Sequence, residues 1–309
     1  MILPTSGHEG LGAGSAAARN RPQAARVRSS RARGRKRVGN TGCYRLKGQR
    51  LSNLKGAGSK LEQLPTEAVN PRTANLDRLP LPAMVRVLQR EDAAVIPAVR
   101  RCAGVIAAAV QRITTRFLAG GRLIYVGAGT SGRLGVLDAA ECPPTFGVTS
   151  GRVLGVIAGG RLALTRSIEG AEDRPQGARQ DLHKLRLTPL DSVVGIAASG
   201  RTPYTVEALA YARQHGCLTI AVTNVKNSRL AGEADVAIEA VTGAEAIAGS
   251  TRMKAGSAQK MILNLISTAL MVRMGRVQGN LMTHLQPTNS KLRERARRIR
   301  RITSDMRLH

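Results

Sequence analysis

Five short apolar runs, separated by stretches with helical periodicity, limit the fold of this chain more than any other feature of its sequence. The runs occupy residues 123–126, 153–158, 192–198, 218–223 and 236–241. Apolar runs of this length are typical of strands that are buried on both faces. Strands that alternate with helices predict an α/β fold, in which helices cover both faces of a parallel sheet.

Helices are expected before, between and after these runs. Apolar residues recur at helical spacing over 82–90 and 93–118, which predicts a helical lead-in before the first strand. Further helices are predicted at 132–140, 162–170, 174–184, from Thr202 to Gly216, and up to about Met274. Glu141 is expected to follow the helix at 132–140, which Pro143 and Pro144 would end.

Basic residues are concentrated at the two ends of the chain. The net charge is +28, of which residues 1–60 contribute +13 and residues 290–309 contribute +6. Residues 1–60 show no helical or strand period, and a segment of this composition buries too little apolar surface to offset its ordering entropy. We therefore predict a basic, disordered arm at 1–60, a sheet domain with its lead-in at 61–290, and a basic helix at 291–309.

The basic arm has three interpretations. It could bind nucleic acid, it could be an Arg-rich transit peptide, or it could lie upstream of the true start of the protein. The third is favoured, because regular patterning begins only near Lys60. The C-terminal basic helix is interpreted as a solvated face. Nucleic acid is therefore not the expected partner, despite the basic ends.

Composition argues against several classes of protein. No apolar run approaches the length of a membrane span, and the N-terminus lacks the apolar stretch of a secretory signal. The four cysteines form no CxxC pair and have no His cluster beside them. We therefore expect reduced thiols, no metal site, no membrane contact and a cytoplasmic location.

Three loops rich in Gly, Ser and Thr stand where an α/β protein binds anions. They are residues 127–133, 198–202 and 249–257. In parallel sheets, ligands bind beyond the carboxyl ends of the strands, and N–H groups at helix starts attract anions. Each loop alone is readily an ordinary capped turn, but the three together predict an anion site.

Two nucleotide-binding patterns were compared with these loops. None of the loops matches the triphosphate-binding pattern GxxxxGK[ST]. The segment Gly127-Ala-Gly-Thr-Ser-Gly132 imitates a dinucleotide fingerprint, but the second predicted strand ends in Gly159-Gly160 rather than in the expected acid. Dinucleotide binding is therefore the weaker alternative.

Few acidic residues lie near these loops. Glu141 precedes the double proline, and Glu169, Glu172 and Asp173 follow the second predicted strand. Their spacing alone favours ordinary surface or helix-end charges.

Several long segments closely resemble N-acetylmuramic acid 6-phosphate etherases. The segments are residues 123–135, 137–147, 169–173, 194–204, 249–256 and 279–282, preceded by Leu64-Pro-Thr-Glu67 with Asn70, Thr73 and Asp77. The resemblance covers roughly residues 61–295 in the family's order. It implies the sugar isomerase (SIS) fold, which is shared with glucokinase regulatory protein, and a homodimer.

The resemblance also implies a reaction. The substrate would be N-acetylmuramic acid 6-phosphate, a phosphorylated amino sugar, cleaved to N-acetylglucosamine 6-phosphate and D-lactate in cell-wall sugar recycling. Removal of the C2 proton of the opened sugar lets lactate leave C3, and water then adds there. In the family's pattern, Glu141 would protonate the departing lactate oxygen and Glu172 would be the base. No metal or organic cofactor is required.

The phosphate of that substrate is assigned to the hydroxyl-rich loops. The candidate side chains are Thr130, Ser131, Ser199, Thr202, Ser250 and Thr251, with Arg133, Arg201, Arg252 and Lys254 as cations. An arginine can hold a phosphate or the lactyl carboxylate through two parallel hydrogen bonds. Such cations could instead brace a dimer or pair with a glutamate.

The sequence departs from the family in two places. His284 stands where an aspartate is expected after the segment 279–282, which could weaken the site. The family also continues with several helices beyond the basic segment at 291–309, which puts stability and dimer packing in question more than the chemistry.

Three other functions remain open at this point. A sugar-phosphate sensor would keep the loops but could discard the acid and the base. A DNA-binding regulator would normally place a helix-turn-helix before the sheet, where residues 1–60 show no helical period. An isomerase would move the C2 proton without releasing lactate. The presence of both Glu141 and Glu172 favours a lyase.

Overall fold

Five parallel strands form one sheet in the order β2-β1-β3-β4-β5. The structure, a computed structural model, describes residues 65–287 and 289–305, so the arm predicted at 1–60 lies outside the described residues. The strands are β1 (Leu123–Gly127), β2 (Val153–Ile157), β3 (Ser192–Ile196), β4 (Leu218–Thr223) and β5 (Val236–Glu239). Each strand overlaps one of the five apolar runs, which confirms the predicted parallel sheet.

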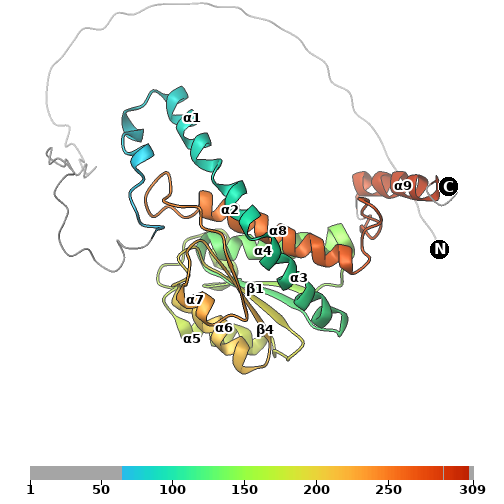
Figure 1. Cartoon of the computed structure of the whole chain (residues 1–309). Helices are drawn as coiled ribbons and strands as arrows, with labels where there is room; N and C mark the ends of the chain where they lie inside the picture. Colours follow the sequence, from blue (N-terminus) through green and yellow to red (C-terminus); the bar gives the residue numbers. More distant parts are fainter. Residues whose placement is uncertain (1–64, 288, 306–309) are drawn as a thin grey trace, which may run out of the picture. The chain divides into compact units, whose positions relative to one another are not determined.

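Helices cover both faces of this sheet (Figure 1). One face carries α2 (Val95–Arg101), α3 (Ala103–Leu118), α4 (Gly129–Phe146) and α8 (Lys254–Arg273). The other face carries α5 (Pro175–Lys184), α6 (Pro203–Gln214) and α7 (Arg229–Gly232). The remaining elements are η2 (Pro71–Thr73), η3 (Leu76–Arg78), α1 (Leu81–Asp92), η4 (Gly160–Leu164) and α9 (Ser290–Asp305).

Alternate side chains of the strands enter two separate cores. In β1, Leu123 and Tyr125 join the core shared with α3, α4 and α8, whereas Ile124 and Val126 join the core shared with α5, α6 and α7. Successive strand side chains point to opposite faces, so a strand covered on both faces must be apolar throughout. This explains why the five runs show continuous rather than alternating hydrophobicity.

The strand order forms a crevice at the carboxyl ends of the neighbouring strands β1 and β3. The chain passes from β1 outward to β2, then returns past β1 to β3 and continues outward to β4 and β5. The direction of the strand order therefore reverses between β1 and β3, and a crevice forms outside their carboxyl ends at such a point. The predicted anion loops 127–133 and 198–202 follow these two strands.

Two helical predictions differ from the structure in ways that follow from packing between elements. The helix predicted over 93–118 breaks at Cys102, which lets α2 pack against α8 while α3 also packs against the sheet. Only the short helix η4 forms within the stretch predicted at 162–170. Here the Arg133 guanidinium donates to the carbonyl oxygens of Leu164 and Arg166, at 3.2 and 2.8 Å, which a continuing helix would need.

The double proline does not end the helix before Glu141. Helix α4 continues to Phe146, so Glu141 lies within it and Pro143 and Pro144 lie in its last turns. Gly147 adopts φ 60° and donates its N–H to the Pro143 carbonyl at 2.9 Å, which closes the helix. Proline disrupts the hydrogen bonds to the carbonyls one turn earlier, and this loss is tolerated so close to a helix end.

Two glycines allow α4 to start directly against β1. A Cβ atom added at Gly132 would lie 2.6 Å from Ile157 Cγ1 and 2.7 Å from the Gly127 carbonyl oxygen. The backbone at Gly127 cannot move away from such a Cβ atom, because Gly127 belongs to a buried central strand. The close approach therefore requires glycine at position 132.

Gly132→Ala is expected to destabilise the chain by about 1–3 kcal/mol, because the added methyl group overpacks a backbone contact. Urea denaturation followed by circular dichroism measures the change. Gly104→Ala is the matched control, because a Cβ atom at this helical glycine meets nothing within 4 Å. Equal stabilities of the two variants would contradict the steric argument.

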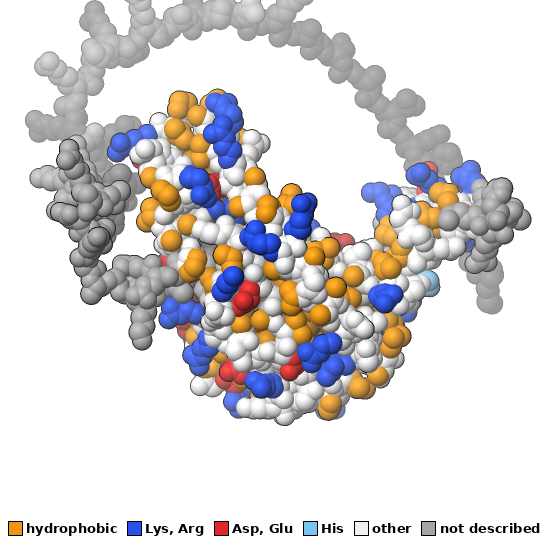
Figure 2. Space-filling view, viewed as in Figure 1, with side chains coloured by type: hydrophobic (Ala, Val, Ile, Leu, Met, Phe, Trp, Pro, Cys, Tyr) orange, Lys and Arg blue, Asp and Glu red, His pale blue; other side chains and the backbone are white. Residues whose placement is uncertain are grey.

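Two observations concern contact with membranes and with nucleic acid. Within the described residues, no single helix is long and apolar enough to cross a membrane. The helical segments 81–101 and 103–118 reach the required length and hydropathy only when they are taken together, and the chain bends by 55° between them. On the face shown in Figure 2, Lys and Arg side chains are scattered among apolar and neutral ones rather than gathered into one continuous patch.

Candidate functional site

Two helices begin at the crevice between β1 and β3 without a side-chain cap. Helix α4 starts at Gly129 directly after β1, and α6 starts at Pro203 after the loop that follows β3. Neither Ala128 nor Thr202, the residues at the two cap positions, makes a side-chain hydrogen bond to its helix. The first N–H groups of a helix have no partner within it. At α6, Pro203 has no N–H, and Tyr204 and Thr205 donate theirs to the carbonyls of Glu172 and Thr202, both at 3.0 Å. The start of α4 is therefore the one of the two that offers backbone donors to an anion.

The third predicted loop, 249–257, lies beside the first. A Cβ atom added at Gly256 would be 3.4 Å from Thr130 Cγ2. The Ser131 hydroxyl, which is buried, donates to Gln259 Oε1 at 2.8 Å, and Gln259 Nε2 donates to Asn224 Oδ1 at 3.0 Å. This bridge ties the start of α4 to α8 and to the end of β4. Because the Ser131 hydroxyl already donates its proton to Gln259, its role in the structure is to hold the loop.

The start of α8 differs from the starts of α4 and α6 because it already holds an anion. The buried Glu245 carboxylate accepts the N–H groups of Lys254 and Ala255, at 3.0 and 2.9 Å. A phosphate therefore finds backbone donors at the start of α4 rather than at the start of α8. Nothing in the local sequence marks Glu245 as the cap, because its role depends on a loop that folds back onto the helix start.

Lys254, one of the predicted substrate-binding cations, is buried in an ion pair. Its side chain is 0% exposed, and its ammonium group donates to Glu91 Oε2 at 2.6 Å and to the Ala244 carbonyl at 2.5 Å. Glu91 also accepts from Asn70 at 2.6 Å and from Arg72 through two bonds of 2.5 and 2.9 Å. Lys254 thus adopts the second role that the sequence allowed, pairing with a glutamate.

The lead-in segment holds the third loop through this cluster. Gly249 donates its N–H to the Thr66 carbonyl at 3.1 Å, and the Thr73 hydroxyl donates to the Ala246 carbonyl at 2.8 Å. Asn70 and Thr73, which the family resemblance included, are buried at this contact. Their function in the structure is to brace residues 244–249 against the rest of the chain.

Acidification is expected to destabilise the chain through Glu91. Arg72, assisted by Lys254 and Asn70, lowers the pKa of this carboxyl from 4.5 to about 2, against the opposing effect of burial. Because the folded-state pKa is depressed, the stabilisation is fully present above about pH 4.5 and is lost as the pH falls through about 2. The loss amounts to roughly 3 kcal/mol at most. Urea denaturation over this range measures it, and Glu91→Gln should show a shallower dependence; equal slopes would contradict the prediction.

Glu172 lies at the crevice between β1 and β3. Its carbonyl accepts the N–H of Tyr204 in the first turn of α6, at 3.0 Å. Its side chain is exposed and lines a cavity of 250 Å³ together with Gly129 and Arg133 of α4. The predicted base therefore stands between the two uncapped helix starts.

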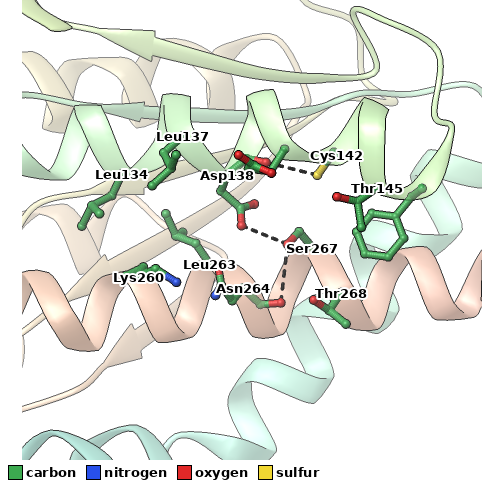
Figure 3. A pocket seen from close by; sticks show the side chains of 12 residues that line it. Leu134, Leu137, Asp138, Cys142, Thr145, Lys260, Leu263, Asn264, Ser267 and Thr268 are labelled. Atoms are coloured by element: carbon green, nitrogen blue, oxygen red, sulfur yellow. Dashed lines mark hydrogen bonds between the residues drawn. The ribbon is translucent and has the colours of Figure 1, made fainter. Parts of the chain in front are cut away.

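Glu141 lies in a different hollow, between α4 and α8. This cavity of 370 Å³ is lined by Leu134, Leu137, Asp138, Glu141, Cys142, Thr145, Phe146, Lys260, Leu263, Asn264, Ser267 and Thr268. Asp138 and Ser267 point toward one another across it, and the Ser267 hydroxyl donates to the Asp138 carboxylate at 3.0 Å (Figure 3). Burial raises the pKa of the Cys142 thiol to about 12, so this neighbour of Glu141 is not a nucleophile.

A single chain does not bring the two glutamates into one cavity. Glu141 lies twelve residues beyond Gly129 along α4, or ~18 Å at the rise of an α-helix. Glu172 shares its cavity with Gly129, at the opposite end of that helix. One glutamate is therefore at the carboxyl edge of the sheet, and the other lies well along α4 from it.

The remaining predicted side chains are distributed around the crevice. Ser199 Oγ accepts the N–H of Arg201 at 3.3 Å, which leaves its own proton for a ligand, and the Arg201 side chain is exposed. Thr202 occupies the cap position of α6. Ser250 and Thr251 lie half-buried in the third loop, where the Thr251 carbonyl accepts the N–H of Gly256.

The sequence did not predict a role for Gln259, and it raised a question about His284 that the structure addresses. Gln259, which bridges Ser131 and Asn224, interrupts the apolar stripe of α8, and this interruption is the signal that could have identified it. The His284 side chain is exposed, and its backbone packs against Gly147 at the end of α4 rather than against the anion loops. No group of three His, Cys, Asp or Glu side chains within the described residues is placed to hold a metal ion.

Comparison with known proteins agrees with this architecture. Residues 105–213 match the family model of the glucokinase regulatory protein N-terminal SIS domain, and residues 174–269 match that of the SIS domain. An N-acetylmuramic acid 6-phosphate etherase of Caldanaerobacter subterraneus is 53% identical over 79% of this chain and 80% of that protein. The etherase of Streptomyces coelicolor is 54% identical over 78% of both chains. This chain belongs to the N-acetylmuramic acid 6-phosphate etherase family.

Proposed function

We propose that this chain cleaves the lactyl ether of N-acetylmuramic acid 6-phosphate, which yields N-acetylglucosamine 6-phosphate and D-lactate. The observation that carries this proposal is the position of Glu172, a carboxylate between two uncapped helix starts at the crevice of the sheet. Relatives at 52–54% identity, each named as this etherase, support the substrate and the reaction.

The phosphate is proposed to bind at the start of α4, with the loop 198–202 beside it. The N–H groups at the start of α4 and the helix dipole favour a dianion there. Ser199 and Thr202 supply hydroxyl donors, with Thr130 across the crevice, while the Ser131 hydroxyl holds the loop through Gln259. The capped start of α8 leaves Ser250 and Thr251 to contribute through their side chains, and Arg201 provides an exposed cation.

The two carboxylates divide the proton transfers between them. With the sugar ring open, the C1 aldehyde acidifies the C2 proton, and Glu172 removes it. The electron pair forms a C2–C3 double bond as the C3–oxygen bond breaks, and Glu141 donates a proton to the departing lactate oxygen. Water then adds at C3 and a proton returns to C2, which restores the saturated sugar.

The working enzyme is proposed to be a homodimer in which each site uses both copies. The ~18 Å between Glu141 and the start of α4 exceeds what a hexose phosphate spans between its phosphate and C3. Glu172 and the anion loops of one copy can meet a substrate whose lactyl group faces Glu141 of the other copy. A two-fold axis would create two such composite sites.

The setting of the reaction follows from its products. The proposed reaction removes the lactyl group that distinguishes a cell-wall sugar, and we place it in the cytoplasmic recycling of such sugars. No cofactor is required, because one acid and one base suffice for elimination and water addition.

The test is lactate release from N-acetylmuramic acid 6-phosphate by the purified full-length chain, followed with D-lactate dehydrogenase. Stoichiometric formation of D-lactate and N-acetylglucosamine 6-phosphate is the expected result. Tight binding of the sugar phosphate without lactate release would instead favour a sugar-phosphate sensor, for which the match to the glucokinase regulatory protein SIS domain gives specific grounds. Neither binding nor turnover would reject both functions.

A further inference from the structure

The hollow between α4 and α8 contains a cation that the reaction scheme has not used. Lys260 of α8 lines the same cavity as Glu141 of α4. The Lys260 side chain is exposed, and no described acid lies within 4 Å of its ammonium group. Figure 3 shows it on the α8 wall, below Leu134 and Leu137 of α4.

A polar relay connects Lys260 to the floor of the hollow. In the amide orientation that satisfies both neighbours, Asn264 Oδ1 accepts from Lys260 Nζ at 2.8 Å and Asn264 Nδ2 donates to Asp138 Oδ1 at 3.2 Å. Asp138 is buried and also accepts from Ser267. The Asn264 amide thus bridges the ammonium group and the Asp138 carboxylate without a direct ion pair between the two charges, so Lys260 can still bind an anion at the rim.

The other cations near the candidate site differ from Lys260. Lys254 is fully buried against Glu91, and Arg133 donates to two backbone carbonyls. Arg201 lies at the crevice, in the loop assigned to the phosphate. Lys260 is therefore the cation that the structure places in one cavity with the proposed acid.

The lactyl group has chemistry that matches this hollow. Its carboxylate carbon is two covalent bonds from the ether oxygen that Glu141 would protonate, and its methyl group branches from the atom between them. A cation beside Glu141 can therefore hold the carboxylate while the ether oxygen meets the acid. The buried Leu263 and the partly exposed Leu134 and Leu137 form an apolar wall for the methyl group.

We propose that the hollow between α4 and α8 is the lactyl subsite, in which Lys260 binds the lactyl carboxylate and thereby selects substrates that carry it. This inference rests on the proposed function and adds a specificity-determining residue to it. A charge-assisted hydrogen bond to a carboxylate gives both strength and direction.

The decisive comparison is between two ligands that differ in the lactyl group. Lys260→Met is expected to lower kcat/KM for N-acetylmuramic acid 6-phosphate about 10- to 100-fold, mainly through KM, because the carboxylate contact exists before and during the reaction. The inhibition constant of N-acetylglucosamine 6-phosphate, which lacks the lactyl group, should stay within about twofold. Lys260→Arg should retain most of the activity because it keeps the charge.

Lys184→Met is the matched control, because Lys184 is an exposed lysine whose partner, Asp181, lies on α5 on the opposite face of the sheet. It should alter neither constant. An unchanged KM in Lys260→Met, or equal weakening of both ligands, would overturn the proposal.

Calorimetric binding separates failure of this inference from failure of the proposed function. If the wild-type chain releases no lactate, the affinity ratio of the two sugar phosphates still reports the subsite. A preference for the lactyl sugar that disappears in Lys260→Met supports the subsite without catalysis. The absence of any such preference in the wild-type chain rejects it.

Discussion

Glu172→Gln and Glu141→Gln are each expected to lower the rate of lactate release about 100- to 10,000-fold, because positioned acids and bases typically contribute this much. Glutamine has nearly the shape of glutamate but neither accepts the C2 proton nor donates one to the leaving oxygen. Both side chains are exposed, so neither substitution buries an unpaired group and both variants should fold. D-lactate formation under saturating substrate measures the loss.

The two variants also test the composite site through complementation. Co-expression of Glu141→Gln with Glu172→Gln yields mixed dimers in which one of the two sites retains both glutamates. With random pairing, the mixture should recover about a quarter of the wild-type activity. If each site were built from a single chain, every site in the mixture would lack one glutamate and no activity would return.

A matched control addresses general effects of removing a carboxylate near the site. Glu169 lines the same cavity as Glu172, and its carboxylate accepts only from the neighbouring Ser167 hydroxyl among the bonds that the structure shows. Glu169→Gln should therefore retain most of the activity. A loss equal to that of Glu172→Gln would move the role of base away from Glu172.

The largest expected effect on stability comes from Glu91→Gln. The substitution leaves the fully buried Lys254 ammonium with neutral acceptors and no negative charge beside it. Removing one partner of a buried ion pair typically costs 3–5 kcal/mol, because the other charge stays buried without compensation. Urea denaturation should therefore show the free energy of unfolding reduced by about this amount.

The reverse substitution should cost less, and this asymmetry is the sharper test. Lys254→Met removes one cation from Glu91, but Arg72 and Asn70 continue to bind the carboxylate. The double variant Glu91→Gln, Lys254→Met should recover part of the stability lost in Glu91→Gln, since no buried charge then lacks a partner. Equal losses in the two single variants would contradict this account.

An exposed ion pair provides the control for these measurements. Arg179 and Glu207 form a salt bridge in which the side chains are 51% and 21% exposed. Glu207→Gln should change the free energy of unfolding by less than about 1 kcal/mol, because solvent screens such pairs. A larger loss there would indicate that surface charge in general, rather than burial, determines the effect.

The sequence by itself determined the elements of the sheet and the loops at its carboxyl edge. Each apolar run became a strand because a strand covered on both faces must be apolar throughout, and this requirement appears directly in the residue pattern. The helix from Thr202 to Gly216 was likewise predictable, because Pro203 and Gly216 act on the backbone next to them. These are local effects, so no knowledge of distant contacts was needed.

The tertiary structure alone decided what each charged side chain does. Lys254 and Glu91 are 163 residues apart in the chain, and no local pattern marks them as a pair. Glu245 caps α8 and Gln259 bridges two loops for the same reason. The continuation of α4 beyond the double proline places Glu141 far along a helix from Glu172. The energy of a charge depends on the groups packed around it, and packing is set by how the elements come together in space.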